Sequence, residues 1–165
     1  MVSPAELYTL LGDVTPLPAD CGEVCGAACC RGDEETGMLL FPCEVAPPFG
    51  RVLELDDRRL FVCDGQCDRE NRPLACRLFP LFPYVTETGR IKAVYDPSAF
   101  AVCPLVQMRA NVRLQRDFVR RVRRVGRRLM RDPDGRAFLI ARSREIDELN
   151  RFLSLNRGRA PMCRR

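Results

Sequence analysis

The 165-residue sequence contains no histidine. Without histidine, the chain can form neither a Ser-His-Asp nor a Cys-His catalytic arrangement. A mixed Cys/His zinc finger and a three-histidine catalytic zinc site are excluded for the same reason. Any transition metal that the side chains bind must therefore be held by sulfur, or by sulfur together with carboxylate oxygen.

Several targeting and cofactor signals are also missing. No run approaches the roughly 18 apolar residues of a membrane-spanning helix, and the first six residues have neither the basic nor the apolar region of a signal peptide. No glycine-rich phosphate loop and no dinucleotide fingerprint occur. We therefore expect a cytoplasmic protein without a membrane partner. A nucleotide-dependent enzyme has no support, and whether the protein is an enzyme at all stays open.

Lysine is nearly absent, and the charges divide unevenly along the chain. Of the 27 basic residues, 26 are arginine. Residues 1–107 carry 9 basic and 16 acidic residues, a net charge of −7, whereas residues 108–165 carry 18 and 6, a net charge of +12. We expect residues 1–107 to form a core unit and residues 108–165 to form an Arg-rich helical hairpin that packs on it, within one compact domain.

Ten cysteines are the dominant feature of the sequence. Eight fall into two groups of four, which we predict to be metal ligands: Cys21, Cys25, Cys29 and Cys30, and then Cys63, Cys67, Cys76 and Cys103. In a reducing cytosol such clusters bind metal more often than they form disulfides. Export by another route would instead favour disulfides. The two remaining cysteines, Cys43 in an apolar segment and Cys163 in a basic tail, are not expected to be ligands.

The residues around the cysteines bear on how the metal is held. Residues 13–75 are rich in Gly, Pro, Asp and Cys, so we expect a metal to organise a segment with few hydrophobic residues. Gly22 and Gly26 favour a loop over a regular helix in the first group. Arg77, next to Cys76, is expected to favour a thiolate. Glu44 and Asp96 lie near these cysteines in sequence, but we do not expect either carboxylate to be a ligand.

The identity and number of the metal centres stay open at this point. Zinc sites usually present Cys-x2-Cys pairs, and this chain has none, because its short gaps contain three residues. Wider gaps suit an iron–sulfur cluster without excluding zinc. The cofactor is therefore expected to be zinc or iron, in one centre or two.

Three segments resemble the YkgJ-type cysteine cluster family, a zinc- or iron-chelating domain. They are the first group ending in Cys29-Cys30, the segment with Cys63, Cys67, Arg72-Pro73, Cys76-Arg77 and Phe79-Pro80, and Cys103-Pro104-Leu105. The resemblance implies metal chelation by the same eight cysteines. Gaps in the first group are looser than the family's compact form, which affects Cys21 and Cys25 most. Related domains occur in flagellin lysine methylases, so an iron–sulfur redox or methyltransferase-related protein is the alternative by analogy.

The secondary-structure signals predict a small, irregular α+β fold with a Cys-rich, metal-organised core. A helix is expected over residues 4–12, with Ser3 as its N-cap. Short strands are expected over residues 51–55, 60–63 and 91–95, with a polar turn over residues 56–59. Helical turns are expected over residues 73–79 and after Asp96-Pro97, and a brief buried segment over residues 37–42.

After Pro104 the pattern becomes helical, and it predicts an antiparallel helical hairpin. Apolar residues at positions 114, 118, 122, 125 and 129 and arginines at 113, 116, 120, 124, 127 and 131 both follow helical spacing. They predict an amphipathic helix of about seven turns, followed by a second helix to about residue 155. The arginine stripe makes nucleic-acid binding a second alternative function. However, aromatic residues are missing from that stripe, and the acidic N-terminal half could pair with it instead.

Overall fold

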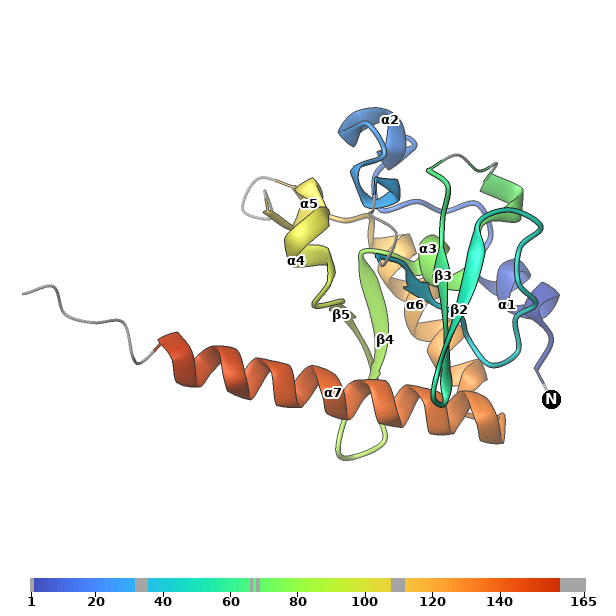
Figure 1. Cartoon of the computed structure of the whole chain (residues 1–165). Helices are drawn as coiled ribbons and strands as arrows, with labels where there is room; N and C mark the ends of the chain where they lie inside the picture. The colour runs from blue at the N-terminus through green and yellow to red at the C-terminus, as the bar shows by residue number, and fades with distance from the viewer. Residues whose placement is uncertain (1, 32–35, 66, 68, 108–111, 158–165) are drawn as a thin grey trace, which may run out of the picture.

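The structure is a computed structural model that describes residues 2–31, 36–65, 67, 69–107 and 112–157 (Figure 1). Its helices are α1 (Pro4–Leu11), α2 (Cys21–Cys25), α3 (Leu74–Leu78), α4 (Ala99–Val102), α5 (Pro104–Gln107), α6 (Arg116–Leu129) and α7 (Pro133–Arg157). Two 3-10 turns are η1 (Ala28–Cys30) and η2 (Arg69–Asn71), and the strands are β1 (Met38–Leu39), β2 (Arg51–Leu55), β3 (Arg58–Val62), β4 (Leu81–Val85) and β5 (Ile91–Tyr95). The α+β class expected from the sequence is confirmed. Of the ten cysteines, Cys163 lies outside the described residues.

The strands form two small antiparallel sheets. The first has the order β1-β3-β2, and its β2–β3 hairpin pairs Arg51 with Val62 and Leu55 with Arg58. The hairpin turn is shorter than predicted, because Arg58 already belongs to β3 and only residues 56 and 57 form the turn, with Asp56 at a φ of 41°. The second sheet consists of β4 and β5.

Strand β4 was not predicted, because its sequence contains a proline. Pro83 lies in the middle of β4 and faces Ala93 of β5. A proline is tolerated where the strand has a free edge, since its missing N–H then removes no ladder hydrogen bond. In a two-stranded sheet each strand has such an edge, so β4 can accommodate Pro83.

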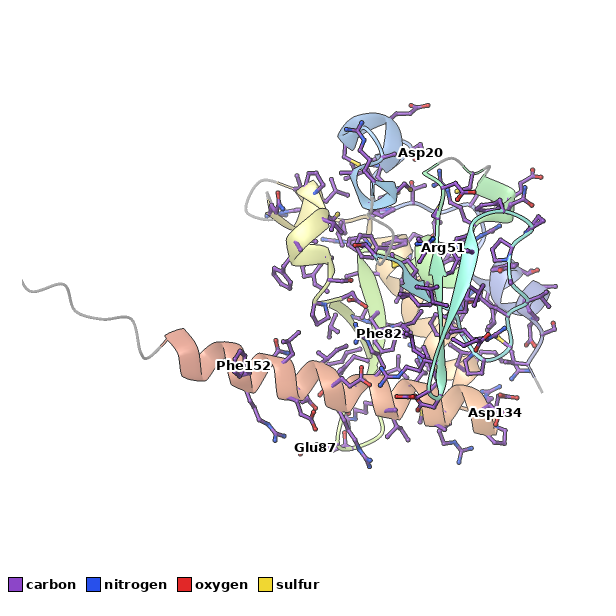
Figure 2. All side chains as sticks on the ribbon, viewed as in Figure 1. Asp20, Arg51, Phe82, Glu87, Asp134 and Phe152 are labelled. Atoms are coloured by element: carbon purple, nitrogen blue, oxygen red, sulfur yellow. The ribbon has the colours of Figure 1, made fainter. Side chains whose placement is uncertain are left out.

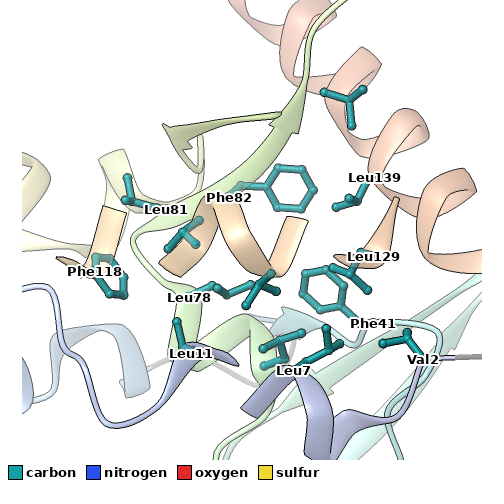
Figure 3. Close-up of a cluster of buried hydrophobic side chains, with 14 of the residues drawn as sticks. Val2, Leu7, Leu11, Phe41, Leu78, Leu81, Phe82, Phe118, Leu129 and Leu139 are labelled. Carbon is teal, nitrogen blue, oxygen red and sulfur yellow. The ribbon is translucent and has the colours of Figure 1, made fainter. Parts of the chain in front are cut away.

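The main hydrophobic core lies between α1, α3, β4, α6 and α7 (Figure 3). Its buried side chains are Val2, Leu7, Leu11, Phe41, Leu74, Leu78, Leu81, Phe82, Val85, Phe118, Val122, Val125, Leu129, Leu139 and Ile146. Ser3 caps α1 by accepting a hydrogen bond from the Glu6 amide, as the sequence predicted. The four apolar residues predicted on the buried face of α6, at positions 118, 122, 125 and 129, are all fully buried.

The C-terminal helices differ from the prediction in length and packing. Helix α6 has 14 residues, about four turns, so the predicted seven turns are wrong. Arg113 and Leu114 precede this helix, which begins after Gln115. Helix α7 packs chiefly on β4 and less on α6, and its C-terminal part extends beyond the rest of the molecule (Figure 1). The two helices therefore do not clearly form the expected antiparallel hairpin.

A glycine allows α6 to pack closely on the second sheet. Gly126 is buried against β4 and β5, where an added Cβ would lie 2.7 Å from Cβ of Pro83 and 2.8 Å from Cγ2 of Ile91. Both neighbouring atoms belong to stiff side chains. The sheet therefore cannot accommodate a larger residue without moving away from α6.

We expect Gly126→Ala to destabilise the protein by about 1–2 kcal/mol. Overpacking costs about 1–3 kcal/mol, whereas the higher helix propensity of alanine stabilises the helix by up to about 1 kcal/mol. Urea unfolding measures the change. Arg124→Ala, on the exposed face of the same helix, is the control and should change the stability by less than about 0.5 kcal/mol. Equal stabilities for the parent and Gly126→Ala would contradict the close packing.

Candidate metal centre

The first cysteine group lies at one end of the molecule, away from the main core. In Figure 1, α2, α4 and α5 are at the top and α7 is at the bottom. Figure 2 shows the same separation, with Asp20 at the end opposite Asp134. Neither α2 nor η1 contains a buried residue. The described residues at this end form a small hydrophobic cluster of Phe79, Ala99, Cys103, Leu105 and Val106.

The backbone of the first group changes direction at its second glycine. Asp20 caps α2 by accepting a hydrogen bond from the Gly22 amide at 2.8 Å. Gly26 ends α2 in the left-handed conformation, with a φ of 62°, which glycine adopts at little cost. A short helix therefore forms where a loop was expected, and it carries Cys21 and Cys25 one turn apart. Cys29 and Cys30 follow in η1, which contacts α4.

The second group is brought in by three other elements. Cys63 and Cys67 follow β3, and the loop between them contains Gly65 at a φ of 86°. Cys76 lies within α3, and Cys103 is the residue that ends α4, with its amide bonded to the Ala99 carbonyl at 2.9 Å. The two sequence groups therefore approach each other through tertiary packing rather than through local spacing.

All eight predicted cysteines line a single cavity of about 110 Å³. Apolar side chains complete its wall: Met38, Phe61, Phe79, Val102 and Leu105. The nine cysteines that the structure describes are all free of disulfides. Cys43 does not line the cavity and packs against the main core instead, as its apolar sequence context predicted. The structure thus brings together the residues chosen from the sequence and leaves Cys43 outside.

The thiols surround the cavity without converging on one point. Within the described part of the chain, no group of three or more Cys, Asp or Glu side chains is gathered closely enough to hold a metal ion. A cavity volume of about 110 Å³ remains between the walls. Metal–thiolate bonds are only about 2.3 Å long, so the walls would have to move inward to bind a single ion through four sulfurs.

Electrostatic interactions between the thiols group the eight cysteines into two sets that are joined through Cys29 and Cys30. Cys30, Cys63, Cys67 and Cys76 form the first set, in which Cys63 and Cys67 are hydrogen bonded and Cys76 lies near the other three. Cys21, Cys25, Cys29 and Cys103 form the second set, in which Cys21 lies near Cys25 and Cys103. The adjacent residues Cys29 and Cys30 are hydrogen bonded across the boundary.

Burial favours the protonated form of four of these thiols. It raises the pKa of Cys21 to about 11, with nearby Cys25 adding to the shift. Burial also raises the pKa of Cys63, Cys76 and Cys103. The pKa of Cys30 is lowered, first by the hydrogen bond from Cys29 and then by the nearby Arg72 guanidinium. A metal that binds here must displace protons from most of its ligands.

Arg72 lines the cavity, although no local sequence signal assigned it a role there. Its side chain hydrogen bonds to Cys67. Burial opposes its charge, but the Cys67 bond and the nearby Asp20 and Cys30 raise the pKa of Arg72 above its usual value. Among the residues that the structure describes, its buried Nε atom has no hydrogen-bond partner. A guanidinium held in this way is available to a thiolate.

Arg77 does not have the role expected of it. Its guanidinium donates hydrogen bonds to the carbonyls of Arg72 at 3.0 Å and Glu70 at 2.6 Å, and it lies 4.3 Å from the centre of the Tyr8 ring. Arg77 therefore holds the backbone that carries Arg72. One local feature distinguishes the two arginines: Arg72 is followed by Pro73, just before the helix that contains Cys76. This position could have indicated that Arg72, and not Arg77, lies beside the cysteines.

The two carboxylates near the cysteines are occupied by other partners. Glu44 is buried and accepts hydrogen bonds from the Tyr8 hydroxyl at 3.0 Å and from the amides of Phe41 at 2.9 Å and Leu74 at 2.6 Å. Asp96 accepts hydrogen bonds from Ser98 and forms an ion pair with Arg142 at 3.3 Å. Neither carboxylate lines the cysteine cavity. Glu44 instead fixes the beginning of α3, the helix that carries Cys76.

Comparisons with known proteins do not identify the chain. A scan against protein-family models, a search of curated proteins and a search of solved structures found no match. The resemblance to the YkgJ-type family therefore stays a prediction. No helix among the described residues is both long enough and apolar enough to cross a bilayer. The function must be inferred from the cavity itself.

Proposed function

We propose that the protein binds zinc or iron through eight thiolates, and that the bound metal organises the end of the molecule that carries α2. One observation carries the proposal. Eight cysteines from two distant parts of the sequence line the same cavity, whereas Cys43 lies outside it. Zinc and iron take thiolate ligands, and the absence of histidine leaves sulfur as the main donor. When bound, such a metal supplies folding energy through its ligand bonds.

The surroundings of the cavity favour a thiolate-bound metal. The first cysteine segment has no fully buried side chain, and only the partly buried Cys21 packs against the small hydrophobic cluster, so little apolar burial fixes its conformation. Arg72 offers positive charge and an N–H group to the anionic sulfurs, a role that outer residues commonly have around metal ligands. The proposal also requires reduced thiols, which fits a cytoplasmic protein.

We further propose that the eight thiolates form two centres. Cys30, Cys63, Cys67 and Cys76 would hold the first, and Cys21, Cys25, Cys29 and Cys103 would hold the second. This division is supported by the electrostatic partners of Cys21, Cys63 and Cys76, whereas Cys29 interacts with Cys30 as well as with Cys21 and Cys25. Four sulfurs per centre satisfy the usual coordination of zinc and also the four-cysteine ligation of an iron–sulfur cluster.

An iron–sulfur centre is the second candidate, and one observation favours it over separate zinc ions. The thiols line a cavity of about 110 Å³ and do not converge on a single-ion position within the described residues. Such spacing suits a centre of several atoms better than one ion. A redox or methyl-transfer role would depend on this version of the centre. Absorption spectroscopy of protein purified without air separates the two: iron–sulfur protein is coloured and is bleached by dithionite, whereas the zinc form is colourless.

Metal content in cysteine variants tests both the ligands and their division. We expect Cys63→Ser/Cys67→Ser and Cys21→Ser/Cys25→Ser each to lose about half of the bound metal, because each pair belongs to one four-sulfur centre. The measurement is the metal-to-protein ratio by mass spectrometry after anaerobic purification.

Cys43→Ser is the matched control, because it removes a half-buried thiol outside the cavity. It should retain the metal content of the parent. If either double variant loses all of its metal, the eight thiolates form one centre. Metal binding itself is wrong if the parent contains no stoichiometric metal, or if Cys43→Ser loses as much metal as the double variants.

A further inference from the structure

Helix α6 presents a continuous cationic face to solvent. Arg116, Arg120, Arg123, Arg124 and Arg127 are exposed on the helix, and Arg131 is exposed just beyond it. At 3.6 residues per turn, these six positions fall within an arc of roughly 100° and extend over roughly 22 Å. The structure adds Arg123 to the predicted stripe and removes Arg113, which precedes the helix. The arginines therefore form one straight row with about one or two charges per turn.

The orientation of this face is fixed by the core. Phe118, Val122, Val125 and Leu129, on the opposite side of α6, are all fully buried. Rotating the helix would expose these four side chains, at a cost of roughly 1.5–3 kcal/mol each. The arginines are consequently held toward solvent and cannot turn inward to meet the rest of the protein.

Among the residues that the structure describes, the acidic half of the chain forms no ion pair with the exposed row, although such pairing was the simpler expectation. Arg128 pairs with Glu6 of α1, and Arg121 pairs with Asp117 and donates to the Leu11 carbonyl. Both arginines lie on the flank of the helix, between the exposed and buried faces. Within the exposed row, Arg120 forms an ion pair with Asp117 at 3.2 Å, and its side chain remains 74% exposed. Exposed pairs of this kind contribute little.

A neighbouring turn extends the cationic surface. Arg90, in the turn between β4 and β5, lines an open hollow together with Arg127 and Arg131. The same hollow contains Gly89, and nothing lies within 4 Å of the position that its Cβ would occupy. Three guanidinium groups from two elements thus surround one accessible space, which suits a group with several negatively charged oxygens.

We propose that this cationic face binds the phosphate backbone of duplex DNA without reading its sequence. Guanidinium groups match phosphate oxygens in a bidentate geometry, and protein–DNA interfaces are polar and strongly positive. A single-stranded nucleic acid would call for aromatic residues that stack on bases, and the exposed face of α6 has none. The major groove of B-form DNA, flanked by two phosphate rows, admits an α-helix, whereas that of duplex RNA is too narrow.

The same face fits other anionic partners less well. A helix that lies on a membrane needs a free apolar face, but the apolar face of α6 is buried. A protein partner usually meets an apolar centre within the contact area. In the described part of the chain, the large exposed hydrophobic side chains are Val24, Val45, Leu55, Phe100, Leu149 and Phe152, and none of these belongs to α6.

Fluorescence anisotropy with a labelled 20-base-pair duplex DNA, over a series of salt concentrations, tests the proposal on the metal-loaded protein. Each neutralised phosphate lowers the slope of log K against log salt by about 0.9, so five or six contacts predict a slope of about −5. Arg116→Gln/Arg123→Gln should make the slope less steep by about 2 and weaken binding roughly 50-fold at 0.1 M salt.

Lys92→Gln/Arg144→Gln is the matched control, because it removes the same charge at exposed positions on β5 and α7. It should bind DNA within about threefold of the parent. The proposal is overturned if the parent does not bind the duplex at low salt, or if both double variants weaken binding equally. It is also overturned if duplex RNA, single-stranded DNA, a polyglutamate peptide or anionic lipid vesicles bind more tightly than duplex DNA. Because α6 is outside the cysteine cavity, none of these results bears on metal binding.

Discussion

If the protein binds the proposed metal, its removal is expected to unfold one end of the molecule and leave the other intact. After anaerobic treatment with a chelator, amide exchange in α2 and η1 should accelerate by at least about a hundredfold, because structural metal binding contributes up to about 10–16 kcal/mol to folding. These two elements contain no buried side chain that could hold them in place. Exchange in α6 should change by less than about threefold, because its apolar face is fully buried in the main core. Hydrogen exchange with mass spectrometry measures both regions in one experiment.

The control for this experiment is the return of the metal. Adding zinc, or ferrous iron together with inorganic sulfide, without air should restore slow exchange in residues 21–30, whereas magnesium should not, because it prefers oxygen ligands. Unchanged exchange in both regions would mean that the cysteine end folds without metal. Equal acceleration in α6 would mean that the metal supports the whole molecule and not one end.

Replacing the buried Glu44 is expected to cause the largest loss of stability from a single change outside the cysteines. Glu44→Ala removes the acceptor for the Tyr8 hydroxyl and for the amides of Phe41 and Leu74. A buried donor without a partner costs about 1–3 kcal/mol, so we expect a total loss of about 3–5 kcal/mol. Because Leu74 begins the helix that carries Cys76, the variant should also bind metal more weakly. Urea unfolding and metal titration measure the two effects.

The pH dependence of the Glu44 effect has a definite sign. Burial raises the pKa of Glu44 above its ordinary value, despite the hydrogen bonds that favour the carboxylate. The carboxyl group therefore stabilises the fold most below its ordinary pKa, and this contribution is lost as the pH rises through the raised value. The stability of the parent relative to Glu44→Gln, which does not titrate at this position, should increase as the pH is lowered. A difference that stays constant with pH would contradict the raised pKa.

The sequence predicted the regular elements and the cysteine set better than the arrangement around them. Periodic apolar residues identified the buried face of α6, because that face meets the core without interruption. The eight cysteines were chosen from their clustering, and they line one cavity. By contrast, β4 was missed because Pro83 argues against a strand unless the sheet has a free edge, and sheet order is a tertiary property.

The roles of individual polar residues depended on long-range contacts that no local pattern contains. Arg77 is next to Cys76 in sequence, yet Arg72 is the arginine that reaches the cysteines, because the guanidinium of Arg77 is held by two backbone carbonyls. Glu44 bonds to Leu74, 30 residues away. The length of α6 was overestimated because helical spacing continued through Arg113 and Leu114, which precede its N-cap.

Cys29 and Cys30 are consecutive residues whose thiols belong to different sets and are hydrogen bonded to each other. If each set holds its own metal, a single peptide unit joins the two ligand shells. Binding of a metal to either set of cysteines then fixes the backbone of the other set. The second metal therefore binds to a segment that has already lost much of its conformational entropy. Loading one shell would therefore raise the metal affinity of the other, while either shell alone can still fill when the metal is in excess.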